Sequence, residues 1–258
     1  PDFWLTDACA AQATDTVFPV SLAGKEYSAR LYKLPVTGYE GRTNTLNLFD
    51  LDTVDESVIG EGISFDKKDI AKNLTLFLYP DDSDEDGRLL RIYQQYFMVS
   101  AGAQLILSEC IARGCNYHDL ADYAAIQIND THPSMVIPEL VRLLMLHDIV
   151  FEEAVQIVTD TCAYTNHTIL AEALEKWPRH YLKNVVPQLM PIIEKLDAVA
   201  KERTEDASLA VIDQNQVVHM AHMDIHFSHS TNGVATLHTQ ILKESELAGF
   251  YHLYPEKF

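Results

Sequence analysis

The sequence AAIQINDTHP, residues 124–133, carries the pattern that decides the predicted fold. Residues 124–128 form a short, mostly apolar run, which is typical of a buried strand, and residues 129–132 are polar. Pro133 follows at a position where a helix accepts proline, because the first helical turn has no hydrogen bond that its missing N–H would break. A strand, a polar loop and a helix in this order are the repeating unit of an α/β fold.

The same order recurs along the chain. Residues 162–164 are a second apolar run, residues 165–168 are polar, and residues 169–176 are predicted to be a helix. Strands that alternate with helices predict an α/β class with a parallel sheet flanked by helices. The other predicted elements are β-strands within residues 15–49, helices over residues 66–78, 88–113, 134–146, 152–159 and 186–201, a strand at 208–212, and two helices joined by a turn from residue 217 on.

The composition narrows the classes of partner. A net charge of −19 argues against nucleic acid or an anionic membrane and is compatible with a neutral ligand such as a sugar. No run of about 18 apolar residues is present, so no membrane span is predicted. Residues 1–4 have no signal-peptide pattern, and the four scattered cysteines (Cys9, Cys110, Cys115 and Cys162) form no C-x-x-C pair. Reduced thiols in the cytoplasm are therefore expected.

Two polar segments each follow an apolar strand, at the edge where α/β sheets bind ligands. They are residues 129–132 and residues 165–168, and Glu172 and Glu175 come shortly after the second. Histidine, asparagine and carboxylate side chains together donate and accept hydrogen bonds, as sugar hydroxyls require. The alternative is that Asn129, Asp130 and Thr131 only cap the next helix.

Other chemistry receives less support from the sequence. Glu172 and Glu175 lie on one helical face, so a hydrolase pair is one alternative and a solvated helix surface is the other. His222, His226 and His229 have spacings i, i+4 and i+7, but the H-E-x-x-H arrangement is missing, which favours polar surface or packing over a metal site. No nucleotide-binding glycine motif or nucleophile elbow occurs.

The same segments resemble the α-glucan phosphorylases, a family that includes glycogen, starch and maltodextrin phosphorylases. The resemblance runs in order from about Phe18 to Phe258. Its strongest parts are residues 126–133 with 137–140 and residues 163–168 with 172–178, and the stretches 34–39, 78–82, 94–97 and 254–258 are also similar. It implies that residues 1–258 are part of the N-terminal domain of a two-domain glycosyltransferase of the GT-B type, a partial Rossmann-like domain with no internal boundary.

The resemblance also implies the reaction and the partners. The family cleaves a terminal α-1,4-linked glucosyl unit of glycogen, starch or maltodextrin with inorganic phosphate, which gives glucose 1-phosphate. The enzyme is expected to be a homodimer and to use the phosphate group of pyridoxal phosphate as an acid and base. A cleft with only one of its two walls cannot preorganise the groups that stabilise a transition state, so the isolated segment is expected to be inactive.

The resemblance assigns roles to single residues. His167 matches the family histidine that contacts the 6-hydroxyl of the reacting sugar, and it is the expected catalytic residue. The expected substrate-binding residues are Asn129, Asp130, His132, Asn166, Ala173 and Glu175.

Parts of the family's machinery fall outside these residues. The lysine that binds the cofactor and the basic residues that bind phosphate are expected in the C-terminal domain, and no metal is expected. Ser108 and Glu109 stand where animal enzymes carry two arginines of an activation site, which argues against control by phosphate. The alternative function is an inert carbohydrate-binding or structural fragment.

Overall fold

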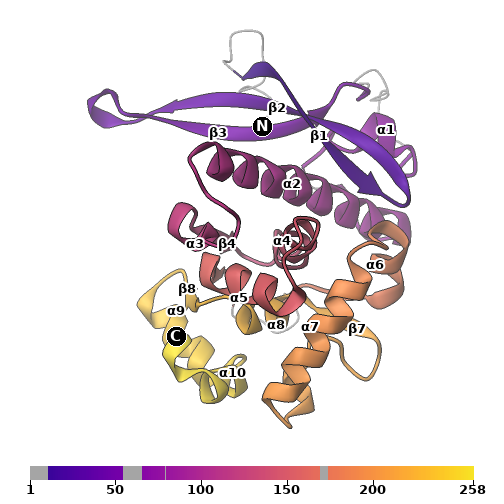
Figure 1. The fold of residues 1–258 in the computed structure, drawn as a ribbon. Coiled ribbons are helices and arrows are strands. Elements are labelled where there is room, and N and C mark those ends of the chain that lie inside the picture. Colours follow the sequence, from indigo (N-terminus) through magenta and orange to yellow (C-terminus); the bar gives the residue numbers. More distant parts are fainter. Residues whose placement is uncertain (1–10, 55–65, 79, 169–173) are drawn as a thin grey trace. The chain divides into compact units, whose positions relative to one another are not determined.

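A computed structural model describes residues 11–54, 66–78, 80–168 and 174–258 (Figure 1). The chain forms two compact units, Pro1–Ala101 and Gly102–Phe258, and the division falls inside the long helix α2 (Glu85–Ala112). That all 258 residues belong to one domain of a larger protein stays a prediction.

The first unit contains an antiparallel sheet of β1 (Gln12–Leu22), β2 (Lys25–Thr37) and β3 (Thr43–Leu51), which confirms the predicted strands. The β1–β2 hairpin turns through Ala23 and Gly24, whose φ angles of 50° and 75° suit a two-residue turn that matches strand twist. β2 and β3 are joined through a 3-10 turn at Tyr39–Gly41.

The predicted helix over residues 66–78 is much shorter than expected, because only α1 (Ile70–Asn73) is helical. The Gln94 side chain donates to the carbonyls of Leu74 and Phe77, at 2.9 and 2.6 Å. These carbonyls therefore have a side-chain partner, and the backbone does not need to continue the helix to satisfy them.

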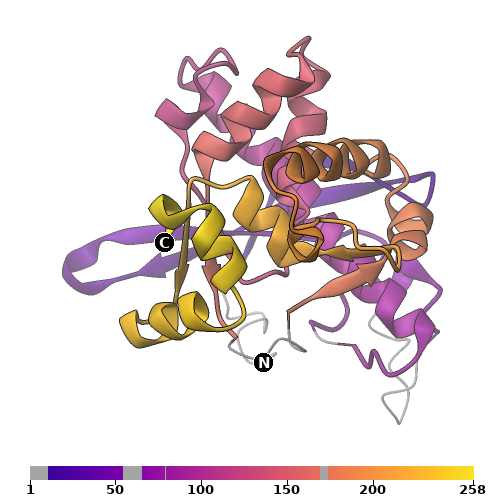
Figure 2. The same ribbon diagram turned by 90° about the horizontal axis from the view of Figure 1, so that it is seen from below.

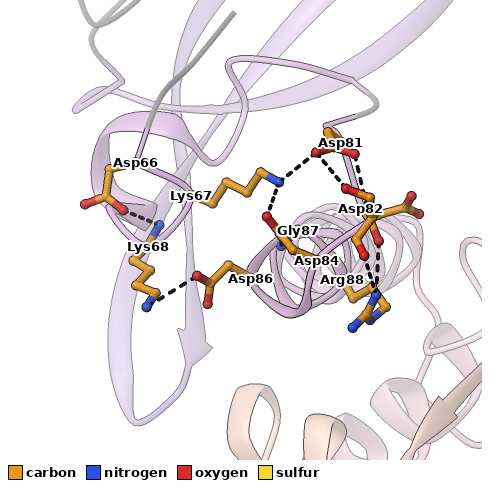
Figure 3. Close-up of polar contacts among 10 residues, drawn as sticks. Asp66, Lys67, Lys68, Asp81, Asp82, Asp84, Asp86, Gly87 and Arg88 are labelled. Atoms are coloured by element: carbon orange, nitrogen blue, oxygen red, sulfur yellow. Dashed lines mark hydrogen bonds and ion pairs between the residues drawn. The ribbon is translucent and has the colours of Figure 1, made fainter.

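An acidic turn precedes α2, as Figure 3 shows. Lys67 Nζ lies 3.2 Å from Asp81 Oδ2 and 2.9 Å from Asp84 Oδ2, and Asp84 Oδ1 accepts the Gly87 N–H at 2.7 Å. A Cβ on Gly87 would lie 2.0 Å from the Asp81 carbonyl oxygen, so the turn requires glycine at this position. The turn fixes the start of α2.

The second unit contains a parallel sheet in the order β4–β5–β8, flanked by helices. The strands are β4 (Ile126–Asn129), β5 (Cys162–Asn166) and β8 (Ser230–Gly233). Helices α4 (Val136–Met145) and α5 (Phe151–Thr161) connect β4 to β5. The α/β class with a parallel sheet is confirmed.

The remaining elements surround this sheet. Helix α8 (Met220–His226) packs against β5 and α7 (Met190–Arg203), and α9 (Thr236–Glu244) packs beside β8 (Figure 2). The others are α3 (Leu120–Tyr123), α6 (Arg179–Val185), α10 (Ala248–Leu253), the antiparallel pair β6 (Lys176–Pro178) and β7 (Val217–His219), and 3-10 turns at Ala207–Leu209 and Pro255–Lys257.

Several predicted elements need correction. The strand expected at residues 208–212 is a 3-10 turn with a single bridge from Ile212 to Val218, because the Ile212 N–H donates to Asp197 Oδ1 at 2.8 Å and not to a strand. The region after residue 217 contains β7 and β8 as well as helices. Of the helix expected at residues 169–176, residues 169–173 lie outside the described part, and Lys176 begins β6.

The helices with clear apolar periodicity are confirmed as α2, α4, α5 and α7. On α4 the side chains of Ile137, Leu140, Val141 and Leu144 are completely buried. Each such side chain contributes about 1.5–3 kcal/mol by leaving water. Within the described residues no helix combines the length and the apolar character that crossing a membrane would need.

Candidate functional site

The two predicted polar segments meet at one edge of the parallel sheet. Asn129 at the end of β4 pairs in register with Thr165 of β5, and the Asp130 N–H donates to the Thr165 carbonyl at 2.8 Å. Asp130 has a φ of 62°, which turns the chain sharply away from the strand. His167 Nε2 then lies 2.5 Å from Asn129 Oδ1.

His132 lies between two carboxylates at the same edge. Its Nε2 is 4.0 Å from Asp130 Oδ2, and its Nδ1 is 3.8 Å from Glu175 Oε2. The His132 side chain is 46% exposed, whereas that of Glu175 is 9% exposed. We call Asn129, Asp130, His132, His167 and Glu175 the edge cluster. It offers ring nitrogens, an amide and the Asp130 carboxylate to a ligand in solvent, whereas Glu175 Oε2 is buried.

The remaining predicted site residues are not members of this cluster. Asn166 is buried, its Nδ2 donates to Tyr164 Oη at 2.9 Å, and its Oδ1 accepts the Thr168 N–H at 2.9 Å. Ala173 lies outside the described residues. Their part in binding a substrate stays a prediction.

The alternative that residues 129–131 cap the next helix is wrong. Helix α4 begins at Val136, and its N-cap residue Met135 has no side-chain cap. Asp130 Oδ1 accepts the neighbouring Thr131 N–H at 2.9 Å, outside the helix. The polar side chains of this loop therefore do not cap helix α4.

A third strand, which the sequence did not predict, ends at the same edge. The sequence assigned Asn232 and Gly233 to an ordinary turn between helices, but both belong to β8. Thr165 Oγ1 donates to Asn232 Oδ1 at 3.0 Å and accepts from Gln127 Nε2 at 2.8 Å, so one hydroxyl links all three strands. An open pocket of about 410 Å³ lies beside them, lined by Asn232, Gly233, Ala235, Thr236, Thr239, Gln240 and Lys243.

His238 on α9 joins β8 to the segment after β5. Its Nδ1 accepts the Val234 N–H at 3.1 Å, and its Nε2 lies 3.2 Å from the Thr168 carbonyl oxygen, to which it donates. A Cβ at position 233 would lie 2.8 Å from the His238 ring. The close approach of ring and backbone therefore depends on Gly233.

The amino-acid sequence matches a known protein family. Residues 8–258 match the family model described as carbohydrate phosphorylase. The chain belongs to the carbohydrate phosphorylase family. The resemblance found in the sequence is thereby confirmed.

Individual relatives agree with the family assignment. The chain is 61% identical over 259 residues to the maltodextrin phosphorylase of Streptococcus pneumoniae, in an alignment that covers 100% of this chain and 34% of that protein. It is 36% identical to the glycogen phosphorylase of Bacillus subtilis, over 100% of this chain and 36% of that protein. It is also 36% identical to the muscle glycogen phosphorylase of Oryctolagus cuniculus, over 88% of this chain and 30% of that protein. The chain thus spans about a third of the length of these relatives.

The side chains of Cys162, Tyr164 and Asp224, next to the edge cluster, are fully buried. Burial raises the pKa of the Cys162 thiol to about 12, and it also raises the pKa of Tyr164 on the same strand. Burial likewise raises the pKa of Asp224 on α8 well above its usual range, although the contact of its carboxyl group with Ser134 acts in the opposite direction. Burial therefore favours the neutral forms of these three groups.

The three spaced histidines have different surroundings. His222 Nδ1 lies 2.8 Å from the Ala210 carbonyl, and His226 lies between the Leu209 carbonyl and Tyr254 Oη. His229 is exposed. Across residues 11–54, 66–78, 80–168 and 174–258, no group of three or more His, Cys, Asp or Glu side chains is arranged to hold a metal ion.

Proposed function

We propose that the edge cluster is one wall of the glucan site of an α-glucan phosphorylase. The whole enzyme would cleave a terminal α-1,4-linked glucosyl unit with inorganic phosphate and release glucose 1-phosphate. The observation that carries the proposal is the contact between His167 and Asn129 at the carboxyl edge of a parallel sheet, in a chain that belongs to the phosphorylase family. Open α/β sheets bind their ligands at this edge.

The contact gives the proposed roles a chemical basis. An amide oxygen only accepts, so His167 donates its Nε2–H to Asn129 Oδ1, and in the neutral form of the ring Nδ1 is an acceptor. A sugar hydroxyl can donate to that nitrogen. Asp130, His132 and Glu175 add acceptors and a second ring, as neighbouring hydroxyls of one sugar would need.

The proposal extends to parts of the protein beyond this chain. The α/β sheet is compatible with the GT-B architecture, in which a second domain would supply the other wall and the basic residues for phosphate. The edge cluster holds no lysine, so its side chains do not fit the aldehyde of pyridoxal phosphate, and that cofactor is proposed to bind in the second domain. The whole enzyme is proposed to be a homodimer.

Phosphorolysis of maltoheptaose by the whole protein tests this function. We expect glucose 1-phosphate to form, and the variant His167→Ala to lose roughly 10- to 100-fold in kcat/KM, because one or two substrate hydrogen bonds are lost. His118→Ala is the matched control, since His118 is exposed and contacts Glu153 away from the edge cluster. Wild-type protein that releases no glucose 1-phosphate would overturn the proposed reaction.

Experiments on the isolated chain distinguish a binding segment from an inert one. Titration of the 258-residue chain with maltoheptaose distinguishes a carbohydrate-binding segment from a purely structural one. Binding that is lost in His167→Ala would support the proposed wall. Phosphorolysis by the chain alone would contradict the view that a second domain completes the site.

A further inference from the structure

A buried serine hydroxyl connects helix α8 to the loop of the edge cluster. Ser134 Oγ lies 2.8 Å from the Thr131 carbonyl oxygen and 2.5 Å from Asp224 Oδ2. Ser134 and Asp224 are completely buried, and Thr131 is 2% exposed. Both distances are those of hydrogen bonds.

Counting hydrogens shows what these two contacts require. A serine hydroxyl has one hydrogen to donate, and a carbonyl oxygen can only accept. If Ser134 donates to Thr131, then the contact between Ser134 and Asp224 is a hydrogen bond only when Asp224 supplies the proton. An ionised Asp224 would instead take the Ser134 hydrogen and leave the Thr131 carbonyl with the weaker Ser134 N–H contact at 3.2 Å.

The surroundings of Asp224 favour its neutral form. Asp224 Oδ1 is buried, and the described residues give it no hydrogen-bond partner. An ionised carboxylate in that position would keep an unsatisfied charged oxygen away from water, which is strongly unfavourable. Two acidic side chains, Glu175 and Asp130, raise the pKa of Asp224 by charge repulsion. Asp224 in turn raises the pKa values of the buried Cys162 and Tyr164 on β5.

We propose that Asp224 is a protonated carboxylic acid that acts through Ser134 as a positioning residue for the loop Asn129–His132. Asp224 donates its O–H to Ser134 Oγ as a hydrogen bond, and Ser134 donates its own O–H to the Thr131 carbonyl oxygen. The loop is thereby fixed next to the residues that bind a ligand. What the loop binds rests on the proposed function, but the hydrogen-bond chain does not.

Infrared spectroscopy of the 258-residue chain tests the protonation directly. The difference spectrum between wild type and Asp224→Asn at neutral pH should contain the C=O band of a protonated acid. Carboxylate bands in its place would overturn the proposal. If Asp224→Asn does not fold, the same band is sought in wild type by its shift on ¹³C labelling of the aspartate carboxyl groups.

Stability as a function of pH gives a second test. A raised carboxyl pKa means that the unfolded chain releases the proton while the folded chain keeps it, so stability is lost as pH rises. The unfolding constant of wild type, relative to that of Asp224→Asn, should rise roughly tenfold per pH unit above the unfolded-state pKa of Asp. A ratio that does not change with pH would overturn the proposal.

The positioning role has its own readout. Asp224→Asn keeps a donor to Ser134, whereas Ser134→Ala removes the link to Thr131. Amide hydrogen exchange at residues 129–132 should therefore accelerate at least tenfold in Ser134→Ala and stay within twofold of wild type in Asp224→Asn. Ser208→Ala is the matched control, because Ser208 donates to Asp206 at 2.6 Å in an exposed turn. Equal exchange in Ser134→Ala and wild type would overturn the positioning role.

The two proposals can fail separately. None of these readouts uses a glucan, so a chain that shows the acid band and the exchange pattern but binds no maltoheptaose would overturn only the proposed function. Absence of the acid band would overturn only the role of Asp224.

Discussion

His226 should make the folded state sensitive to mild acid. The ring is completely buried, donates Nε2–H to the Leu209 carbonyl at 2.9 Å, and accepts from Tyr254 Oη at 2.7 Å. Burial lowers its pKa to about 4, and the nearby cations of Arg203 and Lys257 act in the same direction. The folded state therefore keeps His226 neutral at a pH where the unfolded chain protonates it.

The size of the effect follows from the two pKa values. The difference between 6.5 and about 4 is about 2.5 pH units, which corresponds to about 3 kcal/mol at 1.36 kcal/mol per unit. Because the folded pKa is the lower one, the unfolded state binds the extra proton. Stability is therefore independent of this group above pH 6.5 and is lost as pH falls from about 6.5 to about 4.

Urea denaturation of wild type and His226→Gln between pH 4 and pH 8 measures this contribution. Burial is the largest cause that lowers the pKa of the neighbouring His222 to about 4, and His222 is present in both proteins; the smaller repulsion that His226 exerts on His222 is present only in wild type and is part of the measured difference. The free energy of unfolding of wild type, minus that of His226→Gln, should be constant at pH 7–8 and should fall by about 3 kcal/mol towards pH 4. A difference that is the same at pH 5 and pH 8 would refute the argument.

Two further substitutions test packing and buried charge. Gly233→Ala should destabilise the chain by about 1–3 kcal/mol, because its Cβ would lie 2.8 Å from the His238 ring, and thermal melting should fall accordingly. Arg142→Met should cost about 3 kcal/mol in urea denaturation, because it removes the cation that lies 2.8 Å from the carboxylate of the fully buried Glu139. Arg30→Met, which removes an exposed pair, is its control and should change stability little; equal effects of the two would contradict the argument from burial.

The elements that the sequence predicted correctly are those with a strong local signal. Helix α4 has fully buried side chains at helical spacing, and the strands of the first sheet contain alternating and aromatic residues. The edge cluster could also be predicted in outline, because parallel strands place the residues that follow them at one edge. Asn129 and His167 meet there although 38 residues separate them.

The elements that were missed depend on distant partners. β8 has four residues, Ser-Thr-Asn-Gly, without an apolar run, and it is a strand because Ala163 to Asn166 pair with it. The helix predicted to start at Asp66 ends early because Gln94 occupies its carbonyls. The contact between Ser134 and Asp224 spans 90 residues, so only the folded chain brings them together.

The hydrogen bonds around Asn232 and Gly233 have a consequence for the chemical lifetime of the protein. An Asn-Gly pair ages by deamidation when the glycine nitrogen attacks the asparagine side-chain carbon. Here the Gly233 N–H donates to Thr239 Oγ1 at 2.9 Å, Asn232 Oδ1 accepts from Thr165, and Asn232 Nδ2 donates to the Gly233 carbonyl at 2.8 Å. Attack would have to break these bonds within a strand. Deamidation of Asn232 should therefore be slow in the folded protein and should proceed mainly while the chain is transiently unfolded.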